Sequence, residues 1–334
     1  MKNLLYVGNK LSGHGNTATA IEVLGPLMEQ EGFRVQYTST KRNKVLRLVD
    51  MMWQTVTHFR TTDFVLIDTY STWNFWYAFA VSQLCRILRL KYIPILHGGN
   101  LPQRLKRNPV FCRMVFGHAY CNIAPSGYLH QAFSDAGFGV RVIPNPFDRA
   151  DFPHHERQTL RPRLLWVRSF APIYNPAMAV SVLSLLKVKY PGTSLCMVGP
   201  DKGLLEAVKQ MAATEELDVV FIGRQSKKEW AALSRGYDIF INTSHIDNMP
   251  FSVIEAMSLG MAVVSTNVGG IPHLLTHGEN AMLVPDGDFH SMAESVAELM
   301  ENESLRTSIL KQSEALVAQS SWENVRDKWL EILV

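Results

Sequence analysis

Short runs of apolar residues alternate along the chain with longer amphipathic segments. Runs such as Leu4–Val7, Phe64–Asp68 and Tyr92–Leu96 are mostly apolar and rich in β-branched residues, as the buried strands of parallel sheets are. Between them lie segments with apolar residues at three- and four-residue spacing, for example 18–31 and Trp73–Leu90, which predict helices. Strands that alternate with helices in this way predict an α/β fold built on parallel sheets.

The same alternation occurs twice, on either side of a polar segment. The second series of expected strands is Leu164–Val167, Ser194–Val198, Ile239–Asn242 and Ala262–Thr266. The polar segment Phe152–Arg163 contains two prolines, which favours a hinge. A chain of 334 residues is also long for a single core. We therefore expect two doubly wound domains, at 1–155 and 156–317, followed by an amphipathic C-terminal segment at 318–334.

The segment from Lys41 to Val56 has helical spacing and permits two interpretations. It is either an ordinary helix whose apolar side faces the core, or a basic, aromatic-bearing surface that binds anionic lipid. The apolar side would consist of Val45, Leu46, Val49, Met52, Trp53 and Val56, and the basic residues at its start are Lys41, Arg42, Lys44 and Arg47.

The overall composition is that of a globular protein in a reducing compartment. Hydrophobic residues make up 47% of the chain and charged residues 19%, and no run of about 18 uncharged apolar residues suggests a membrane span. The first residues read as a strand rather than as a signal peptide. Four cysteines lie in apolar surroundings without metal-like spacing, as reduced core residues do: Cys85, Cys112, Cys121 and Cys196. We expect a cytoplasmic protein.

Charge is distributed unevenly between the two halves. Residues 1–150 hold 17 Lys and Arg against 8 Asp and Glu, whereas residues 151–334 hold 16 against 22. The basic half predicts an anionic partner, and an anionic membrane surface on the inner face of the cytoplasmic membrane is one candidate. Nucleic acid is not expected, because the basic residues follow no reading helix and the aromatic residues look like core.

Two features of the first half suggest ligand contacts. A strand, a glycine-containing loop and a helix open the chain, and this unit lets the backbone approach a phosphate. The loop positions concerned are Gly13, His14, Gly15 and Asn16. His97 follows the strand Tyr92–Leu96, and a residue at the carboxyl end of a parallel strand points toward the place where such sheets bind ligands.

The stretch Asn242–Pro272 carries the most informative pattern. A strand end, a polar loop and a short helix beginning at Pro250 are followed by a buried strand. A helix N-terminus beside a polar loop can bind an anion. Glu255, inside that helix, does not suit the same anion, and vicinal ribose hydroxyls are a candidate partner for its carboxylate. A second acid, Asp247, stands eight positions earlier in the loop.

This spacing, with E-A-M-S-L-G-M-A-V-V-S-T and G-G-I-P behind it, resembles the acidic-x7-acidic motif of retaining glycosyltransferases of family 4. That family usually has Glu at both ends, and Asp247 replaces the first one here. The resemblance is sharp over 239–286 and diffuse before residue 90. It implies the GT-B fold, in which two Rossmann-like doubly wound domains face each other across a cleft, with the last helix crossing back to the first domain.

The resemblance also implies a reaction: transfer of a sugar from a nucleotide diphosphate donor to an acceptor hydroxyl. In R-S-F-A-P-I-Y-N-P, Arg168 matches the family's arginine that clamps the diphosphate. The family's lysine is missing, and Tyr174 and Asn175 stand in its region, so a weaker contact would replace a charge-assisted one. Asp247 would position the donor sugar, and Glu255 would hold the ribose.

The other implied contacts come mainly from backbone groups and from one histidine. His97 would touch the donor sugar or the acceptor, and Gly223 and Arg224 would lie along the nucleotide base. The departing diphosphate would be stabilised by the turn made of Asn248, Met249, Pro250, Phe251 and Ser252. No metal site is evident and no cofactor is expected, because Arg168 and the helix end would carry the charge.

The expected acceptor is a glycan or a lipid-linked saccharide in cell-surface polysaccharide assembly. Two alternatives stay open. The missing lysine and the Asp-for-Glu change are also compatible with a non-catalytic GT-B subunit that partners another transferase. A GT-B nucleotide-sugar epimerase would share the donor site but would not need a basic surface facing an acceptor.

Overall fold

The computed structural model describes residues 2–10, 19–247 and 249–334. The chain divides into two compact units, which we call unit 1 (Met1–Pro146 with Trp322–Val334) and unit 2 (Phe147–Ser321). The sequence placed the two boundaries at 155/156 and 317/318, within nine residues of these positions. The polar segment 152–163, expected to be a hinge, lies within unit 2.

Unit 1 is built on a parallel sheet with the strand order β2-β1-β3-β4-β5-β6. Its strands are β1 (Asn3–Val7), β2 (Arg34–Thr38), β3 (Phe64–Thr69), β4 (Lys91–Leu96), β5 (Asn122–Ala124) and β6 (Val140–Val142). The chain moves from β1 to β2 on one side and then returns to place β3 on the other side of β1. The switch point of unit 1 therefore lies between β1 and β3, and such sheets bind ligands at this position.

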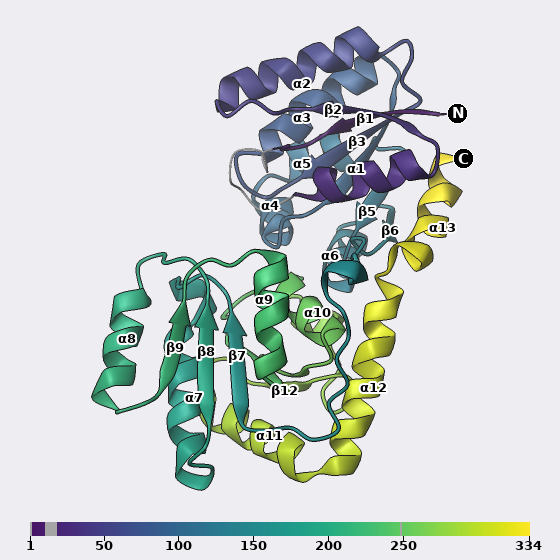
Figure 1. Ribbon diagram of the computed structural model, residues 1–334. Coiled ribbons are helices and arrows are strands. Elements are labelled where there is room, and N and C mark those ends of the chain that lie inside the picture. The colour runs from purple at the N-terminus through teal and green to yellow at the C-terminus, as the bar shows by residue number, and fades with distance from the viewer. Residues whose placement is uncertain (1, 11–18, 248) are drawn as a thin grey trace. The chain divides into compact units, whose positions relative to one another are not determined.

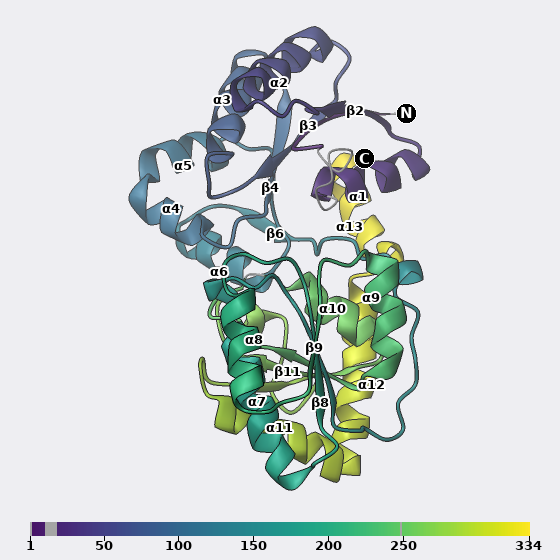
Figure 2. The ribbon, with the colours of Figure 1, turned by 60° about the vertical axis from the view of Figure 1, so that its left-hand side comes forward.

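Helices cover both faces of this sheet (Figure 2). They are α1 (Ala20–Gln30), α2 (Lys44–His58), α3 (Phe75–Ile87), α4 (Leu101–Arg107), α5 (Pro109–Phe116), α6 (Gly127–Asp135) and α13 (Trp322–Leu333). Side chains of β1 alternate between the faces: Leu4 and Tyr6 pack with α1 and α13, whereas Leu5 and Val7 pack with α2 and α3. This alternation explains why the strands are apolar on both faces.

Helix α2 forms as predicted, but its orientation contradicts the interpretation of 41–56 as a helix with its apolar side in the core. Val45, Leu46, Val49, Trp53 and Val56 are all exposed, whereas Met52 is partly buried. The side that faces the sheet carries Met51, Thr55 and Arg47 instead. The interpretation as a core-facing helix was wrong because helical spacing shows which residues share a side of the helix, but not whether that side faces the core or the solvent.

Unit 2 contains a second parallel sheet, with the order β12-β11-β10-β7-β8-β9. Its strands are β7 (Arg163–Val167), β8 (Ser194–Val198), β9 (Val219–Ile222), β10 (Ile239–Asn242), β11 (Ala262–Thr266) and β12 (Met282–Val284). The chain builds outward from β7 to β9 and then crosses back to place β10 on the other side of β7. The switch point of unit 2 thus lies between β7 and β10.

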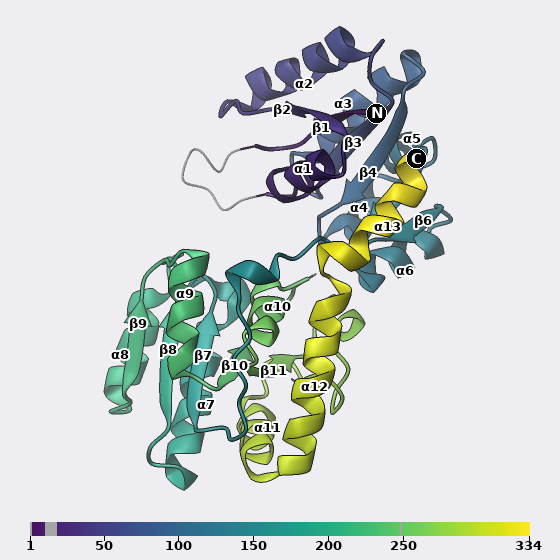
Figure 3. The same cartoon turned by 45° about the vertical axis from the view of Figure 1, so that its right-hand side comes forward.

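The helices of unit 2 also form two layers, which Figures 1 and 3 show on either side of the sheet. One layer contains α7 (Pro176–Lys189), α8 (Leu205–Thr214) and α11 (Phe289–Glu301), and the other contains α9 (Lys227–Leu233), α10 (Phe251–Ser258) and the end of α12 (Glu303–Gln319). Short 3-10 turns complete the unit: η2 (Arg149–Asp151), η3 (Pro172–Tyr174), η4 (Ser234–Gly236) and η5 (Ile271–His273).

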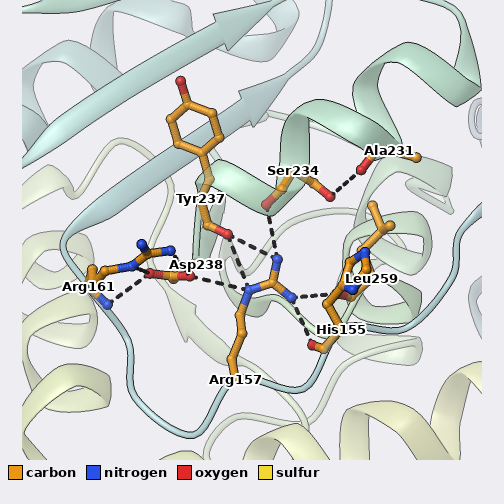
Figure 4. Close-up of polar contacts among 8 residues, drawn as sticks. All are labelled: His155, Arg157, Arg161, Ala231, Ser234, Tyr237, Asp238 and Leu259. Carbon is orange, nitrogen blue, oxygen red and sulfur yellow. Dashed lines mark hydrogen bonds and ion pairs between the residues drawn. The ribbon is translucent and has the colours of Figure 1, made fainter.

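The polar segment 152–163 is fastened to unit 2 by two arginines (Figure 4). The Arg157 side chain is only 6% exposed and forms an ion pair with Asp238, with Nε 3.5 Å from Oδ1. Asp238 also accepts from Arg161 Nε at 2.7 Å. The Arg157 guanidinium donates to four backbone carbonyls, those of His155, Ser234, Tyr237 and Leu259. Charge-assisted bonds to fixed carbonyls make this segment part of the unit rather than a free connection.

Candidate functional site

Two loops of unit 2 begin at its switch point. Arg168 follows β7 directly, and residues 243–250 connect β10 to α10. Because β7 and β10 are adjacent and parallel, their carboxyl ends lie side by side at one edge of the sheet. The loop with the expected diphosphate contact and the loop with the first acid of the motif therefore meet.

Arg168 and Asp247 form an ion pair. The distance from Arg168 Nη2 to Asp247 Oδ2 is 2.6 Å, and each side chain is 15% exposed. The Arg168 guanidinium also lies 5.2 Å from the centre of the Tyr174 ring, within range of a cation–π contact. Its Nε–H is buried and has no partner among the described residues. The pair therefore keeps at least one unused donor at the switch point.

Hydrogen bonds tie the two loops together beneath this pair. Trp166 Nε1 donates to Thr243 Oγ1 at 2.9 Å, and Thr243 Oγ1 donates to the Tyr174 carbonyl at 2.8 Å. The backbone N–H of His245 donates to the Ile173 carbonyl at 2.8 Å. Tyr174, which stands in the region of the family's lysine, thus contributes both a ring beside Arg168 and a carbonyl that holds the second loop.

Asn175 completes the first loop with a backbone conformation that few side chains tolerate. Its φ of 42° and ψ of 60° are left-handed, and it is the cap residue before α7. Asparagine adopts this conformation more readily than most residues because its short polar side chain can bond locally. The Tyr174–Asn175 pair therefore has a structural role in positioning the loop after β7.

Two glycines allow the backbone around the ion pair to pack closely. Gly269 has a φ of +57°, and a Cβ there would lie 2.2 Å from the Asp247 carbonyl oxygen. The next residue, Gly270, donates its N–H to the same oxygen at 2.7 Å. A Cβ on Gly199, which follows β8, would lie 1.8 Å from the Arg168 carbonyl oxygen. The G-G of the G-G-I-P sequence thus fixes the position of Asp247.

Helix α10 begins beside these loops. Pro250 is its cap residue and Phe251 its first residue, one position later than the sequence suggested. The Phe251 side chain is 44% exposed. The Ser252 side chain is buried, and its Oγ has no described partner. The leading N–H groups of a helix have no intrahelical acceptors, so this end is suited to an anion.

Glu255 lies one turn further along α10 and is partly buried. Burial raises the pKa of its carboxyl group to about 7, while the charges of Lys227 and Arg168 act in the opposite direction. No described residue donates a hydrogen bond to this carboxylate. Lys227, the first residue of α9, was not predicted from the sequence, because a lysine at the start of a short helix carries no motif of its own.

Gly223 and Arg224 follow β9, at the outer edge of the sheet. Both are exposed, and a Cβ on Gly223 would meet no atom within 4 Å. Strand β9 lies three strands from β10, roughly 14 Å at about 4.8 Å for each step. These residues thus lie at the same edge of the sheet as Arg168, but far from it along that edge.

Met249 is partly buried just before α10, and Asn248 lies outside the described residues.

Unit 1 has its own polar cluster at the carboxyl ends of β3 and β4. His97 Nε2 lies 2.9 Å from Asp68 Oδ1, and the two side chains are 7% and 0% exposed. Tyr6 donates its hydroxyl to the same oxygen at 3.1 Å. Asp68 Oδ2 is buried without a described partner. A Cβ on Gly8, just after β1, would lie 2.5 Å from Oδ2, so Asp68 sits at the switch point of unit 1.

The cluster keeps the His97 ring in a fixed orientation. Its backbone N–H donates to the Thr69 carbonyl at 2.8 Å, and its ring packs 5.4 Å from that of Tyr70. Burial and the nearby Asp68 charge raise the pKa of Tyr6 and of Tyr70, so both phenols are neutral near pH 7. His97 was predicted from the sequence and Asp68 was not, although an acid near the end of the apolar run F-V-L-I-D-T was a readable signal.

The glycine loop of the first half, with Gly13, His14, Gly15 and Asn16, lies outside the described residues. Within the described part of the chain, no three His, Cys, Asp or Glu side chains form a group that could hold a metal ion. Among the same residues, no helix combines the length and the apolar character needed to cross a bilayer.

Comparison with known proteins identifies the family to which this chain belongs. Residues 148–316, most of unit 2, match the model of the family described as glycosyl transferases group 1. A 168-residue region, 48% of the chain, is 26% identical to D-inositol 3-phosphate glycosyltransferase of Mycolicibacterium smegmatis and covers 38% of that protein. A region of 190 residues, 55% of the chain, is 25% identical to phosphatidyl-myo-inositol mannosyltransferase of the same organism and covers 48% of it. The matched regions thus span less than half of these relatives.

The fold is shared over a longer part of the chain than the sequence similarity. The structure of Anabaena HepE in complex with UDP superposes with a TM-score of 0.78 at 18% identity, covering 100% of this chain and 99% of that one. Two units, each with a parallel doubly wound sheet, are the GT-B fold, as the sequence predicted. The chain belongs to the family of glycosyl transferases group 1.

Proposed function

We propose that this chain is a retaining glycosyltransferase that moves a sugar from a nucleotide diphosphate donor to an acceptor hydroxyl. The observation that carries the proposal is the Arg168–Asp247 pair at the switch point of unit 2, beside the N-terminus of α10. The names of two relatives, which describe glycosyl transfer to D-inositol 3-phosphate and mannosyl transfer to phosphatidyl-myo-inositol, support this reaction class. The HepE structure in complex with UDP supports a nucleotide diphosphate as the donor's leaving group.

In this proposal the diphosphate binds between Arg168 and the first turn of α10. The unpartnered Nε–H of Arg168 and the leading N–H groups of the helix are donors aimed at an anion. Ser252 Oγ adds a buried hydroxyl that lacks a described partner. Loss of one such preorganised donor typically costs about 3–4 kcal/mol of transition-state stabilisation. We propose that these groups carry the departing charge without a metal ion or another cofactor.

The nucleoside extends from this point toward the outer strands of unit 2. Glu255 is one turn from the anion-binding end of α10, and its carboxylate has no described donor, so it can accept from two ribose hydroxyls. Gly223 and Arg224, beyond the end of β9, would lie along the base. The pKa of Glu255 near 7 is consistent with a carboxyl group that gains its full set of donors only when a ligand binds.

Asp247 has two successive partners in this scheme. Asp247 pairs with Arg168 and neutralises it, which holds the guanidinium in place at the switch point. When the diphosphate binds, it competes for the same guanidinium, and the Asp247 carboxylate becomes available to the hydroxyls of the donor sugar. Gly269 and Gly270 hold the Asp247 backbone in position through this exchange.

Unit 1 would contribute His97 to the donor sugar or the acceptor. Asp68 fixes the ring through Nε2, so Nδ1 is the nitrogen left for a ligand hydroxyl. We propose that Asp68 is a positioning residue for His97. The acceptor would be a glycan or a lipid-linked saccharide in cell-surface polysaccharide assembly, with the reaction in the cytoplasm.

A direct test combines binding and turnover on the full chain. A thermal-shift screen against UDP, GDP and CMP sugars identifies a donor, and hydrolysis or transfer of that donor is then measured for Arg168→Ala, Asp247→Ala and Glu255→Ala. We expect a stabilising diphosphate sugar and a loss of turnover in the variants. Arg163→Ala, at the opposite end of β7, serves as a matched control. Unchanged activity in all three site variants would overturn the assignment.

One observation favours a second candidate, a non-catalytic subunit that partners another transferase. The lysine expected in the diphosphate clamp is absent, and the remaining Arg168 is already paired with Asp247. Donor turnover by the isolated chain separates the two candidates, because a non-catalytic subunit would bind the donor without consuming it.

A further inference from the structure

The outward side of helix α2 is a continuous apolar stripe. It contains Val45, Leu46, Val49, Trp53 and Val56, which are 69%, 59%, 58%, 64% and 43% exposed. At 100° per residue, these five positions fall within an arc of about 100°. In Figures 1 and 3 α2 lies outermost on its face of unit 1. Such a contiguous row of large exposed apolar side chains marks an interaction surface rather than scattered exposure.

The stripe does not contribute to the core of unit 1. The opposite side of α2 already packs on the sheet layer through Met51, which is buried, and through Leu48 and Met52. The buried Thr55 donates its hydroxyl to the Met51 carbonyl at 2.8 Å within the helix. The usual arrangement is thus reversed, with polar groups on the inner side of the helix and a tryptophan on the outer side.

Basic residues lie at both ends of the stripe, and the first group is held in a defined conformation. The buried Arg47 side chain donates from Nε to the Lys41 carbonyl at 2.8 Å and from Nη2 to the Arg42 carbonyl at 3.1 Å. Asn43 caps the helix by accepting from two backbone N–H groups. Lys41, Arg42 and Lys44 are therefore exposed on a fixed segment at one end, and Arg60 is exposed just past the other end.

The charge around the stripe has a single sign. Residues 41–60 contain five basic residues and one acidic residue. That acid, Asp50, accepts a hydrogen bond from the Thr38 hydroxyl of β2 at 3.3 Å and so is turned toward the sheet. An apolar stripe with one tryptophan and a basic border has the composition of helices that lie in the interface of an anionic membrane.

We propose that α2, with the segment that precedes it, docks unit 1 onto an anionic lipid bilayer. The stripe would enter the boundary between headgroups and acyl chains, while Lys41, Arg42, Lys44 and Arg60 contact lipid phosphates. A second copy of the chain fits this face less well. A two-fold contact would place the same basic border on both sides and would bring like charges together. This proposal does not depend on the transfer reaction.

The experiment is co-sedimentation of the full chain with vesicles of phosphatidylcholine alone or mixed with phosphatidylglycerol. We expect binding only to the mixed vesicles, weakening as salt is added, with a blue shift of tryptophan emission that is lost in Trp53→Phe. The double variant Val49→Ser/Trp53→Ser should lower the partition coefficient at least tenfold. The triple variant Lys41→Gln/Arg42→Gln/Lys44→Gln should lower it on mixed vesicles at low salt.

A matched control tests whether other exposed apolar side chains contribute to vesicle binding as those of the stripe do. Val188 and Val220 are 85% and 45% exposed on unit 2, so Val188→Ser/Val220→Ser should bind vesicles as the wild type does. All changed side chains are exposed, and thermal unfolding should confirm that the variants are folded. The proposal fails if the wild type does not bind mixed vesicles at low salt or if Val49→Ser/Trp53→Ser binds as well as the wild type. A wild-type dimer that this variant dissociates, without any effect on vesicle binding, would instead make the face an interface between copies.

Discussion

The two units share one architecture, but the residues at their switch points have opposite chemistry. Unit 2 presents a cation, Arg168, beside a helix N-terminus, with Asp247 as its counter-charge. Unit 1 presents a buried acid, Asp68, that pairs with no Lys or Arg among the described residues and holds a histidine and a tyrosine. One arrangement is suited to an anionic leaving group, and the other to orienting an imidazole toward a neutral hydroxyl. Doubly wound sheets thus fix where ligands bind, whereas the residues just after the strands decide which ligands.

The largest effect that this comparison predicts comes from Arg168. Arg168→Ala should lower kcat/KM for transfer by about 100- to 1,000-fold, because a preorganised donor to the leaving group is lost. Arg168→Lys should recover part of the activity, since it restores the charge but not the fork of donors. Steady-state kinetics with a donor identified by thermal shift provide the measurement. If Arg168→Ala and the control Arg163→Ala behave alike, unit 2 does not hold the diphosphate at its switch point.

Asp247→Asn should separate binding from chemistry within unit 2. We expect turnover to fall by about 100-fold, as for a lost transition-state contact. Donor affinity should stay the same or increase, because the amide no longer competes with the diphosphate for Arg168. Calorimetric titration of the donor and single-turnover kinetics give the two quantities. If donor affinity and turnover fell together, Asp247 would contribute to binding of the donor and not specifically to the transfer step.

A smaller effect is expected in unit 1. Asp68→Asn should lower kcat/KM for the acceptor about tenfold, roughly the value of one hydrogen bond, and should leave donor affinity unchanged. This loss should not add to that of His97→Ala, because Asp68 acts through the orientation of the His97 ring. Asp135→Asn, on an exposed position of α6, is the matched control. If Asp68→Asn changed stability alone, or lowered kcat/KM further in the His97→Ala background, its role would be structural.

The smallest expected effect is a dependence of stability on pH through Glu255. Its pKa of about 7 in the folded protein lies above that of a glutamate in an unfolded chain, about 4.3. The folded state therefore binds this proton more tightly, and the free energy of unfolding falls by up to about 3 kcal/mol as pH rises from about 4.5 to 7. In Glu255→Gln this contribution is absent. The variant should resemble the wild type at pH 5 and unfold a few degrees higher at pH 8.

The same titration should appear in donor binding. Only ionised Glu255 accepts from both ribose hydroxyls, so the affinity for a nucleotide diphosphate sugar should rise several-fold from pH 6 to pH 8 in the wild type and stay flat in Glu255→Gln. A diphosphate sugar is the right probe because its phosphates carry no proton that titrates in this range. Parallel pH dependence in both proteins would remove Glu255 from the donor site.

Much of the fold could be predicted from local patterns. The principal strands are apolar on both faces because parallel sheets are covered by helices on both sides, and such runs are visible in any sequence. Helices α4, α5 and α9 were not predicted, because seven or eight residues are too few to show a clear period on their own. The equally short α10 was predicted from the motif around it. Helix α9 did carry a signal that could have been used, the capping box from Ser226 to Glu229.

The sequence by itself determined the parts of the candidate site that lie within one segment: Asp247 and Glu255 around a helix start, and His97 at a strand end. Only the tertiary structure decided which distant residues meet. Arg168 and Asp247 are 79 positions apart, and Asp68 and His97 are 29 apart. Both meetings depend on which strands are neighbours in a sheet, and strand order is set by packing of the whole unit. Likewise, only packing decided that the apolar side of α2 faces outward, because periodicity defines a side of a helix but not its direction.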